Sequence, residues 1–96
     1  MIVSDEPGFY QPGAYGIRLE NLLLVQPAPF PEAKKPFLRF ETLTLAPFDR
    51  RLIEPAMLDA DELRWLNAYH RRVLEEVGPA LDGPDRAWLE AACAPL

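Results

Sequence analysis

The chain has 96 residues, a formal net charge of −5, one cysteine and one histidine. A single domain is the default at this length. The negative charge disfavours nucleic acid and anionic membrane surfaces as partners, because both attract clustered basic side chains. A lone cysteine excludes an internal disulfide and, with one histidine, a Cys/His zinc cluster. Because the chain cannot form an internal disulfide, we expect a reducing, cytoplasmic setting. Neither a secretory leader nor an apolar run long enough to span a bilayer is evident.

The first half of the chain has the pattern of strands separated by turns. Three strands are predicted, over 1–4, 16–25 and 37–45. The dipeptides Pro7-Gly8 and Pro12-Gly13 predict turns between the first two strands. A proline-rich loop over 26–36 is expected between the second and third strands.

The second half predicts two helices. Asp59 is a favourable N-cap, and Glu62 three residues later completes the pattern of a capping box. Apolar residues then recur at helical spacing until the dipeptide Gly78-Pro79, which ends the helix. A shorter helix is expected from Pro84 through Ala92. Strands followed by helices indicate an α+β fold, with short antiparallel strands and then two C-terminal helices.

Charged residues stand out in the predicted strand over 16–25. Arg18 and Glu20 share one face of it, because alternate residues of a strand point the same way. Both faces of this strand are largely apolar, so we expect it to be buried on both sides. Arg18 and Glu20 would then lie in the interior, where a charge is costly unless it is paired or binds a metal.

Glu6 follows the first predicted strand and can meet Glu20 if the first two strands pair as a hairpin. Two converging carboxylates offer the oxygen ligands that Mn²⁺ and Mg²⁺ prefer. Asp5 points to the opposite face and cannot join them. Two other interpretations stay open at this stage: Glu6 as a turn residue, and Arg18 with Glu20 as a structural ion pair.

The residues around both glutamates form recognisable motifs. Ser4-Asp5-Glu6-Pro7-Gly8-Phe9-Tyr10 and Gly16-Ile17-Arg18-Leu19-Glu20-Asn21 resemble the last two metal-ligand motifs of Xaa-Pro aminopeptidases, the aminopeptidase P branch of the pita-bread metallopeptidases. The stretches 40–47 and 65–70 resemble the C-terminal extension of that family. The resemblance implies a division into residues 1–46, the C-terminal end of the catalytic domain, and residues 47–96, a helical C-terminal extension.

The resemblance also implies a chemistry. Members bind two divalent metal ions, usually manganese, and remove the N-terminal residue that precedes a proline. Glu6 matches the glutamate that binds one metal and does acid/base work on the bridging water. Glu20 matches the glutamate that bridges both metals. Tyr10 and Arg18 match outer residues that orient the ligand carboxylates.

Several family features have no match here. The two aspartates and the ligand histidine of the family lie upstream of these motifs, and no segment of this chain resembles them. His70 lies on the first predicted helix and is expected to be structural, as a partly buried histidine whose hydrogen bonds are satisfied. We therefore expect the chain to begin inside the catalytic fold, as a truncated protein, a proteolytic remnant or the product of an internal start. Alone it should be inactive and bind metal only weakly.

Three functions follow as hypotheses. The chain is the C-terminal part of an Xaa-Pro aminopeptidase whose partner is the missing N-terminal catalytic portion. Alternatively it is a non-catalytic interaction module that forms a homo-oligomer through faces left uncovered. In the third, it is one half of a split peptidase. Of the remaining residues, we expect core or interface roles for Trp65, Tyr69 and Trp88, solvated surface for Arg50 and Arg51, and an apolar role for Cys93.

Overall fold

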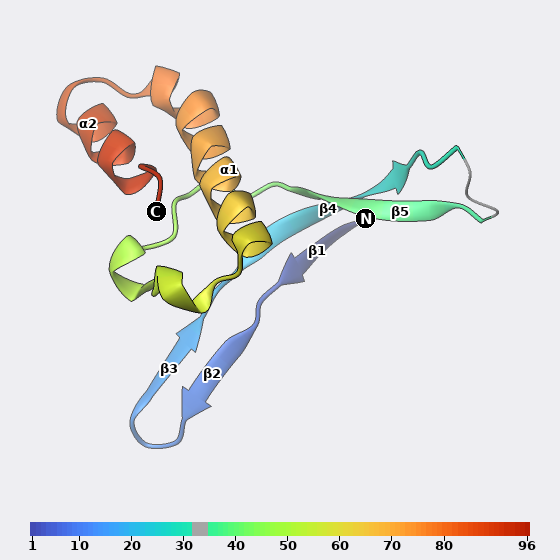
Figure 1. Ribbon diagram of the computed structural model, residues 1–96, viewed down its shortest axis with the longest axis horizontal. Coiled ribbons are helices and arrows are strands. Elements are labelled where there is room, and N and C mark those ends of the chain that lie inside the picture. Colours follow the sequence, from blue (N-terminus) through green and yellow to red (C-terminus); the bar gives the residue numbers. More distant parts are fainter. Residues whose placement is uncertain (32–34) are drawn as a thin grey trace. The chain divides into compact units, whose positions relative to one another are not determined.

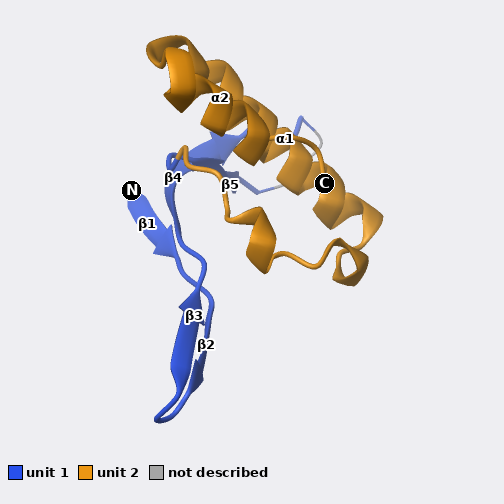
Figure 2. Cartoon of the chain, turned by 90° about the vertical axis from the view of Figure 1, so that its left-hand side faces the viewer, with its two compact units in different colours: residues 1–44 blue, residues 45–96 orange. Residues whose placement is uncertain are grey.

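The computed structural model describes residues 1–31 and 35–96. The chain forms two compact units, Met1–Thr44 and Leu45–Leu96 (Figure 2). The first unit contains the strands and the second contains the helices (Figure 1). This arrangement confirms the predicted α+β fold of short antiparallel strands followed by two helices.

Two antiparallel sheets make up the first unit. The strands are β1 (Ile2–Asp5), β2 (Gly8–Gln11), β3 (Tyr15–Arg18), β4 (Asn21–Ala28) and β5 (Phe37–Thr42). One sheet has the order β1-β4-β5 and the other is the hairpin β2-β3. Figure 1 shows β1 leading directly into β2, and β3 leading back into β4. Together these four strands form one long, interrupted hairpin.

Turn prediction was right at one end of the hairpin and wrong at the other. At Pro12-Gly13 the chain does turn: Ala14 N–H donates to the Gln11 carbonyl at 3.0 Å, and Gly13 has a φ of +73°. This left-handed conformation suits glycine. At Pro7-Gly8 the chain continues from β1 into β2 instead. Pro7 has no N–H for a ladder, so it produces a break in the strand rather than a reversal.

The second and third predicted strands also differ from the structure, and the third, β5, ends at Thr42 rather than at residue 45. The strand expected over 16–25 is two strands, separated by Leu19 and Glu20. The expected proline-rich loop begins later, because β4 extends through Pro27, which pairs with Leu38. β1 pairs with β4 only as far as Leu24, so Pro27 lies where one side of β4 is an edge and needs no donor. Part of this loop, residues 32–34, lies outside the described residues.

The helical unit follows its predicted caps. Its main helices are α1 (Ala60–Val77) and α2 (Gly83–Ala92), with short 3₁₀ helices η1 (Arg50–Leu52), η2 (Pro55–Met57) and η3 (Gly78–Ala80). Asp59 accepts from Glu62 N–H at 2.8 Å, and Glu62 accepts from Asp59 N–H at 2.9 Å. This reciprocal pair is the predicted capping box. Each of the four predicted helix ends lies within one residue of its place, whereas none of the three 3₁₀ helices was predicted.

The core of the helical unit forms where α1 faces α2. Tyr69 and Val73 of α1 pack with Leu89 and Cys93 at the end of α2. Of the three predicted core or interface aromatics, only Tyr69 is buried; Trp65 stacks on it at 5.4 Å but stays exposed, as does Trp88. None of the helices in 1–31 and 35–96 is long and apolar enough to cross a membrane.

Candidate metal-ligand site

Glu6 and Glu20 stand opposite each other at the interruption of the long hairpin. On one side of them Asp5 pairs with Asn21. On the other side Gly8 pairs with Arg18, and Leu19 N–H donates to the Pro7 carbonyl at 3.0 Å. The register is the same on both sides, so Glu6 and Glu20 are cross-strand neighbours. Such neighbours have Cβ atoms about 4.5–5.5 Å apart and point to the same face.

Each of these two glutamates already has one partner. The Ser4 hydroxyl donates to Oε2 of Glu6 at 2.7 Å. Nε of Arg18 lies 3.5 Å from Oε2 of Glu20. Sequence reasoning identified Arg18 but missed Ser4, although Ser4 precedes Glu6 by two residues on a strand and so shares its face. One oxygen on each side of the pair is thus oriented by a neighbouring side chain.

The burial predicted for Arg18 and Glu20 is wrong. Their side chains are 54% and 41% exposed, and within 16–25 only Asn21 is buried. The apolar residues on both faces indicated a strand buried between two layers, but the strand unit itself contains no second layer among its described residues. An exposed ion pair such as Arg18–Glu20 is worth about 0–1 kcal/mol.

The other predicted residues fall where strand alternation puts them. Tyr10 pairs with Gly16 and lies on the face of Glu6 and Glu20, four residues from Glu6. Asp5 pairs with Asn21 and lies on the opposite face. Register and strand alternation therefore assign Glu6, Glu20, Arg18 and Tyr10 to one face of the hairpin, and Arg18 and Glu20 form an ion pair there.

As a metal site, this arrangement is incomplete. Two facing carboxylates suit a hard divalent cation as two of its ligands. No group of three or more histidine, cysteine, aspartate or glutamate side chains in the described part of the chain could hold a metal ion. A two-ion centre built on Glu6 and Glu20 therefore requires further ligands from outside these residues.

His70 makes a structural contact elsewhere, but it is more deeply buried than predicted, and only one of its two ring nitrogens has a hydrogen-bond partner among the described residues. It is fully buried, and its Nε2 accepts from Phe48 N–H at 3.1 Å. The ring proton must then be on Nδ1, which has no hydrogen-bond partner among the described residues. Burial, and secondarily the nearby Arg50 charge, lowers the pKa of His70. Its role is to hold the segment that precedes η1 in place.

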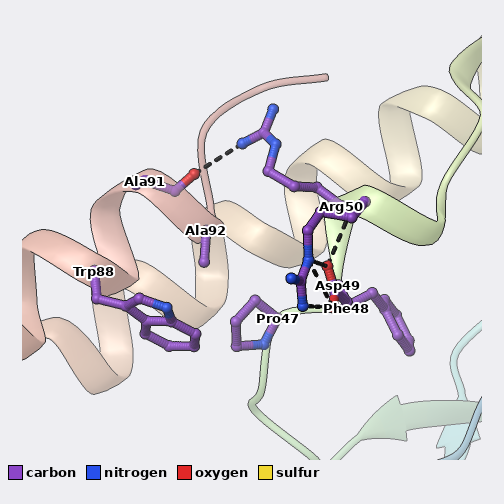
Figure 3. A pocket seen from close by; sticks show the side chains of 8 residues that line it. Pro47, Phe48, Asp49, Arg50, Trp88, Ala91 and Ala92 are labelled. Atoms are coloured by element: carbon purple, nitrogen blue, oxygen red, sulfur yellow. Dashed lines mark hydrogen bonds and ion pairs between the residues drawn. The ribbon is translucent and has the colours of Figure 1, made fainter.

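A hollow of about 440 Å³ in the helical unit is the other place where charged groups gather (Figure 3). Arg51 binds Asp49 at 2.6 Å and lowers the pKa of that carboxyl to about 2. Arg50, predicted to be solvated surface, instead donates to the carbonyl of Ala91 at 2.8 Å. These charged side chains already have partners, so the hollow contains no free catalytic group. Its lining residues are Pro47, Phe48, Asp49, Arg50, Arg51, Trp88, Ala91 and Ala92.

The family described as the C-terminal region of peptidase_M24 matches residues 36–96. The chain belongs to this peptidase M24 family. Its relatives include aminopeptidase P1 of Lotus japonicus, 43% identical over the whole chain, and a probable Xaa-Pro aminopeptidase P of Aspergillus flavus, 39% identical over 99% of it. The resemblance of this chain to the C-terminal part of Xaa-Pro aminopeptidases is therefore confirmed.

A solved structure agrees with this assignment to peptidase M24. The X-prolyl aminopeptidase of Caenorhabditis elegans, described as a cytosolic enzyme with a di-nuclear active site, matches 99% of this chain with a TM-score of 0.85 and 38% identity. The chain covers 16% of that protein and 15% of each of the two curated relatives. The peptidase M24 relatives are thus more than six times as long as this chain.

Proposed function

We propose that this chain provides two carboxylate ligands, Glu6 and Glu20, to the two-metal centre of an Xaa-Pro aminopeptidase. The observation that carries the proposal is their cross-strand opposition at the break in the hairpin. The di-nuclear site of the C. elegans relative supports it. The remaining ligands would come from an N-terminal catalytic portion, with residues 1–46 completing the catalytic domain and 47–96 forming an extension that braces it and contributes to a dimer.

In this proposal each side chain has a separate task. Glu6 would bind one ion and would accept or return the proton of the attacking water, while the Ser4 hydroxyl donates to its Oε2. Glu20 would be a ligand to both ions, and Arg18 would orient its carboxylate. Bound divalent ions, manganese in this proposal, would lower the pKa of a water molecule enough to supply a nucleophile at neutral pH. The substrate would be a peptide with proline at its second position, hydrolysed in the cytoplasm.

A Mn²⁺ titration followed by NMR tests the ligand assignment on this chain. Because Mn²⁺ broadens nearby resonances even when it binds weakly, we expect selective broadening of residues 5–7 and 19–21. The Glu20→Gln variant should lose most of it, since one of the two carboxylates is gone. Glu75→Gln, an exposed carboxylate on α1, is the matched control and should change nothing. Equal broadening around all acidic residues would contradict the assignment.

Turnover tests the incompleteness of the site. The 96-residue chain with added Mn²⁺ should not hydrolyse an Xaa-Pro peptide, because two carboxylates cannot hold two ions in a reactive arrangement. Hydrolysis that survives in Glu6→Gln would reveal a contaminating peptidase. Hydrolysis lost in that variant would show that this chain needs no other portion. If activity instead appears only when a separate upstream polypeptide is added, the chain is one half of a split peptidase.

A non-catalytic interaction module is the second candidate, favoured by the exposed apolar side chains of the strands. Phe9 and Ile17 form a cross-strand pair and are 56% and 50% exposed. Leu38 and Phe40 of β5 are exposed too. Apolar surface of this kind drives association. This candidate predicts a homo-oligomer, and a monomer in light scattering at high micromolar concentration would contradict it.

A further inference from the structure

Strand β5 lies at an edge of its sheet. In the order β1-β4-β5 it pairs with β4, and no other strand of the described residues pairs with it. Its first four residues, 37–40, are exposed, and Leu38 and Phe40 keep 68% and 65% of their surface in solvent. The edge of a sheet presents backbone N–H and C=O groups to which a further strand can pair.

The ladder with β4 determines which backbone groups of β5 face this edge. Leu43 N–H donates to the Leu22 carbonyl at 2.7 Å, in the same register as the rest of the ladder. The backbone groups of successive residues alternate in direction along an antiparallel strand. Those of Arg39 therefore face β4, as do those of Leu43, whereas those of Leu38 and Phe40 face the edge. An added strand must present its own outward groups to Leu38 and Phe40.

The two faces of β5 carry different side chains. Arg39 and Glu41 share one face with Gln26 of β4, whose Nε2 donates to Oε2 of Glu41 at 2.6 Å. Leu38 and Phe40 point to the other face. A copy of β5 therefore continues both faces of the sheet only where polar residues lie opposite polar ones and apolar residues opposite apolar ones.

One antiparallel register of two β5 strands meets both conditions. With Phe40 opposite Phe40 of the other strand, outward backbone groups meet, and each Arg39 lies opposite the Glu41 of the other strand. A shift by one residue puts outward groups opposite inward ones. With Arg39 or Glu41 at the centre, like charges lie opposite each other, which is destabilising. Only with Phe40 at the centre do the unlike charges meet.

We propose that β5 pairs with β5 of a second copy of this chain about a two-fold axis at Phe40, with Arg39 of each copy opposite Glu41 of the other. The Arg39–Glu41 pairs are of the non-hydrogen-bonded type, in which Cα atoms lie about 4.5 Å apart and side chains approach closely. Glu41 can accept from Arg39 as well as from Gln26, because a carboxylate has about four lone-pair sites. This interface specifies the homo-oligomer of the interaction-module candidate and rests on it.

Charge reversal tests the pairing. The wild type should be a dimer in sedimentation equilibrium and should dissociate on dilution, because the paired strands are only six residues long. Arg39→Glu and Glu41→Arg should each raise the dissociation constant about tenfold or more, since two pairs of unlike charges become two pairs of like charges. An equimolar mixture of the two variants should dimerise as tightly as the wild type, because the acidic strand of one variant lies opposite the basic strand of the other.

Arg71→Glu and Glu75→Arg are the matched controls. Both residues are exposed on α1, and their substitutions change the net charge by the same amounts as those at Arg39 and Glu41. Neither control should change the dissociation constant. Mixing also separates lost pairing from lost structure, because a variant that failed to fold would not be restored by the other variant.

Nuclear Overhauser contacts between differently labelled copies identify the register. In a mixture of ¹³C-labelled and unlabelled wild type, we expect a contact between the α-protons of Arg39 in one copy and Glu41 in the other. Within one copy these two residues are separated by about 6.8 Å along the strand, too far for a strong contact. A dimer without this contact between copies would overturn the proposed register.

The outcomes separate this interface from the proposed functions. A monomer at high micromolar concentration would overturn both the β5 interface and the interaction-module candidate. A dimer that charge reversal does not weaken, or that mixing does not restore, would overturn the β5 interface alone and would favour another surface, such as that of Phe9 and Ile17. The assignment of Glu6 and Glu20 as metal ligands is decided separately, by the Mn²⁺ titration.

Discussion

The strand unit and the helical unit differ in what they bury. The helical unit has its own core, in which Tyr69, Val73, Leu89 and Cys93 are each at most 5% exposed. Among the described residues of the strand unit, only Asn21 is buried. A chain segment can hold strand geometry through ladder hydrogen bonds, but hydrophobic stabilisation needs apolar area removed from water. The site glutamates belong to the unit that lacks such a core.

This difference indicates which unit stands alone. The helical unit also holds its own N-terminal segment by hydrogen bonds. The Tyr69 hydroxyl donates to the Ala46 carbonyl at 2.7 Å, and His70 accepts from Phe48 N–H. The strand unit offers apolar side chains on both faces of its hairpin without covering either. We expect the helical unit to fold by itself and the strand unit to need a partner surface, as the proposed catalytic portion would provide.

The largest expected effect on stability comes from truncating one leucine in each unit. Leu89→Ala should lower the free energy of unfolding by about 2–5 kcal/mol, because it leaves a cavity in the helical core. Leu22→Ala in β4 should cost much less than that, since Leu22 is 45% exposed in the wild type. Urea unfolding followed by tryptophan fluorescence and by far-ultraviolet circular dichroism measures both. Equal losses would mean that the strand unit has a core of its own in solution.

A smaller effect should appear on acidification. The pKa of His70 is lowered from its usual 6.5 by burial first and by Arg50 second. The unfolded chain then binds the proton more readily, so stability is fully present above pH 6.5 and decreases as the pH falls from 6.5 toward the folded pKa. Protonation also removes the acceptor for Phe48 N–H, which costs about 1–3 kcal/mol.

Thermal unfolding of the helical unit between pH 7.5 and 5 measures this loss. The His70→Gln variant is the control, because it has no ring to titrate and its stability should be nearly flat over that range. Asp49 does not interfere, since its pKa of about 2 places its own contribution at far lower pH. If the stability of the wild type changed as little with pH as that of His70→Gln, this would contradict a buried, neutral His70 ring.

The smallest expected effect is a difference in the free energy of unfolding between variants of the two helix caps. Asp59→Ala should lower the free energy of unfolding by about 1 kcal/mol, because the side chain caps Glu62 N–H. Asp82 occupies the same position before α2 but makes no capping hydrogen bond, so Asp82→Ala should cost less. Chemical unfolding of both variants checks the order. The reverse order would mean that α1 is held by tertiary packing alone.

Local signals in the sequence were enough to predict the helices. Asp59 with Glu62, and Gly78 before Pro79, act within one or two turns, so their effect does not depend on distant residues. The opposition of Glu6 and Glu20 was also predictable, because strand alternation and hairpin pairing fix which side chains meet. Together these patterns gave the α+β order and the main residues of the candidate site.

What could not be predicted depends on the surroundings of the hairpin. Apolar residues on both faces indicated burial of Arg18 and Glu20, but burial requires a covering layer, and the described residues of the strand unit do not form one. The turn expected at Pro7-Gly8 failed because Leu19 bonds across to Pro7 and keeps the strands together. The close approach of the Tyr10 ring to Gly16 could not be predicted for a different reason. It is possible only because glycine has no side chain, and a pattern of apolar residues does not show this.

The single thiol of the chain gives access to the motions of the helical unit. Cys93 is buried at the end of α2, and burial raises its pKa. Thiol reagents react with the accessible thiolate, so the folded unit protects this sulfur from labelling. The rate of labelling therefore reports how often α2 separates from α1. Cys93 thus serves as a natural probe of local opening, and no engineered probe is required.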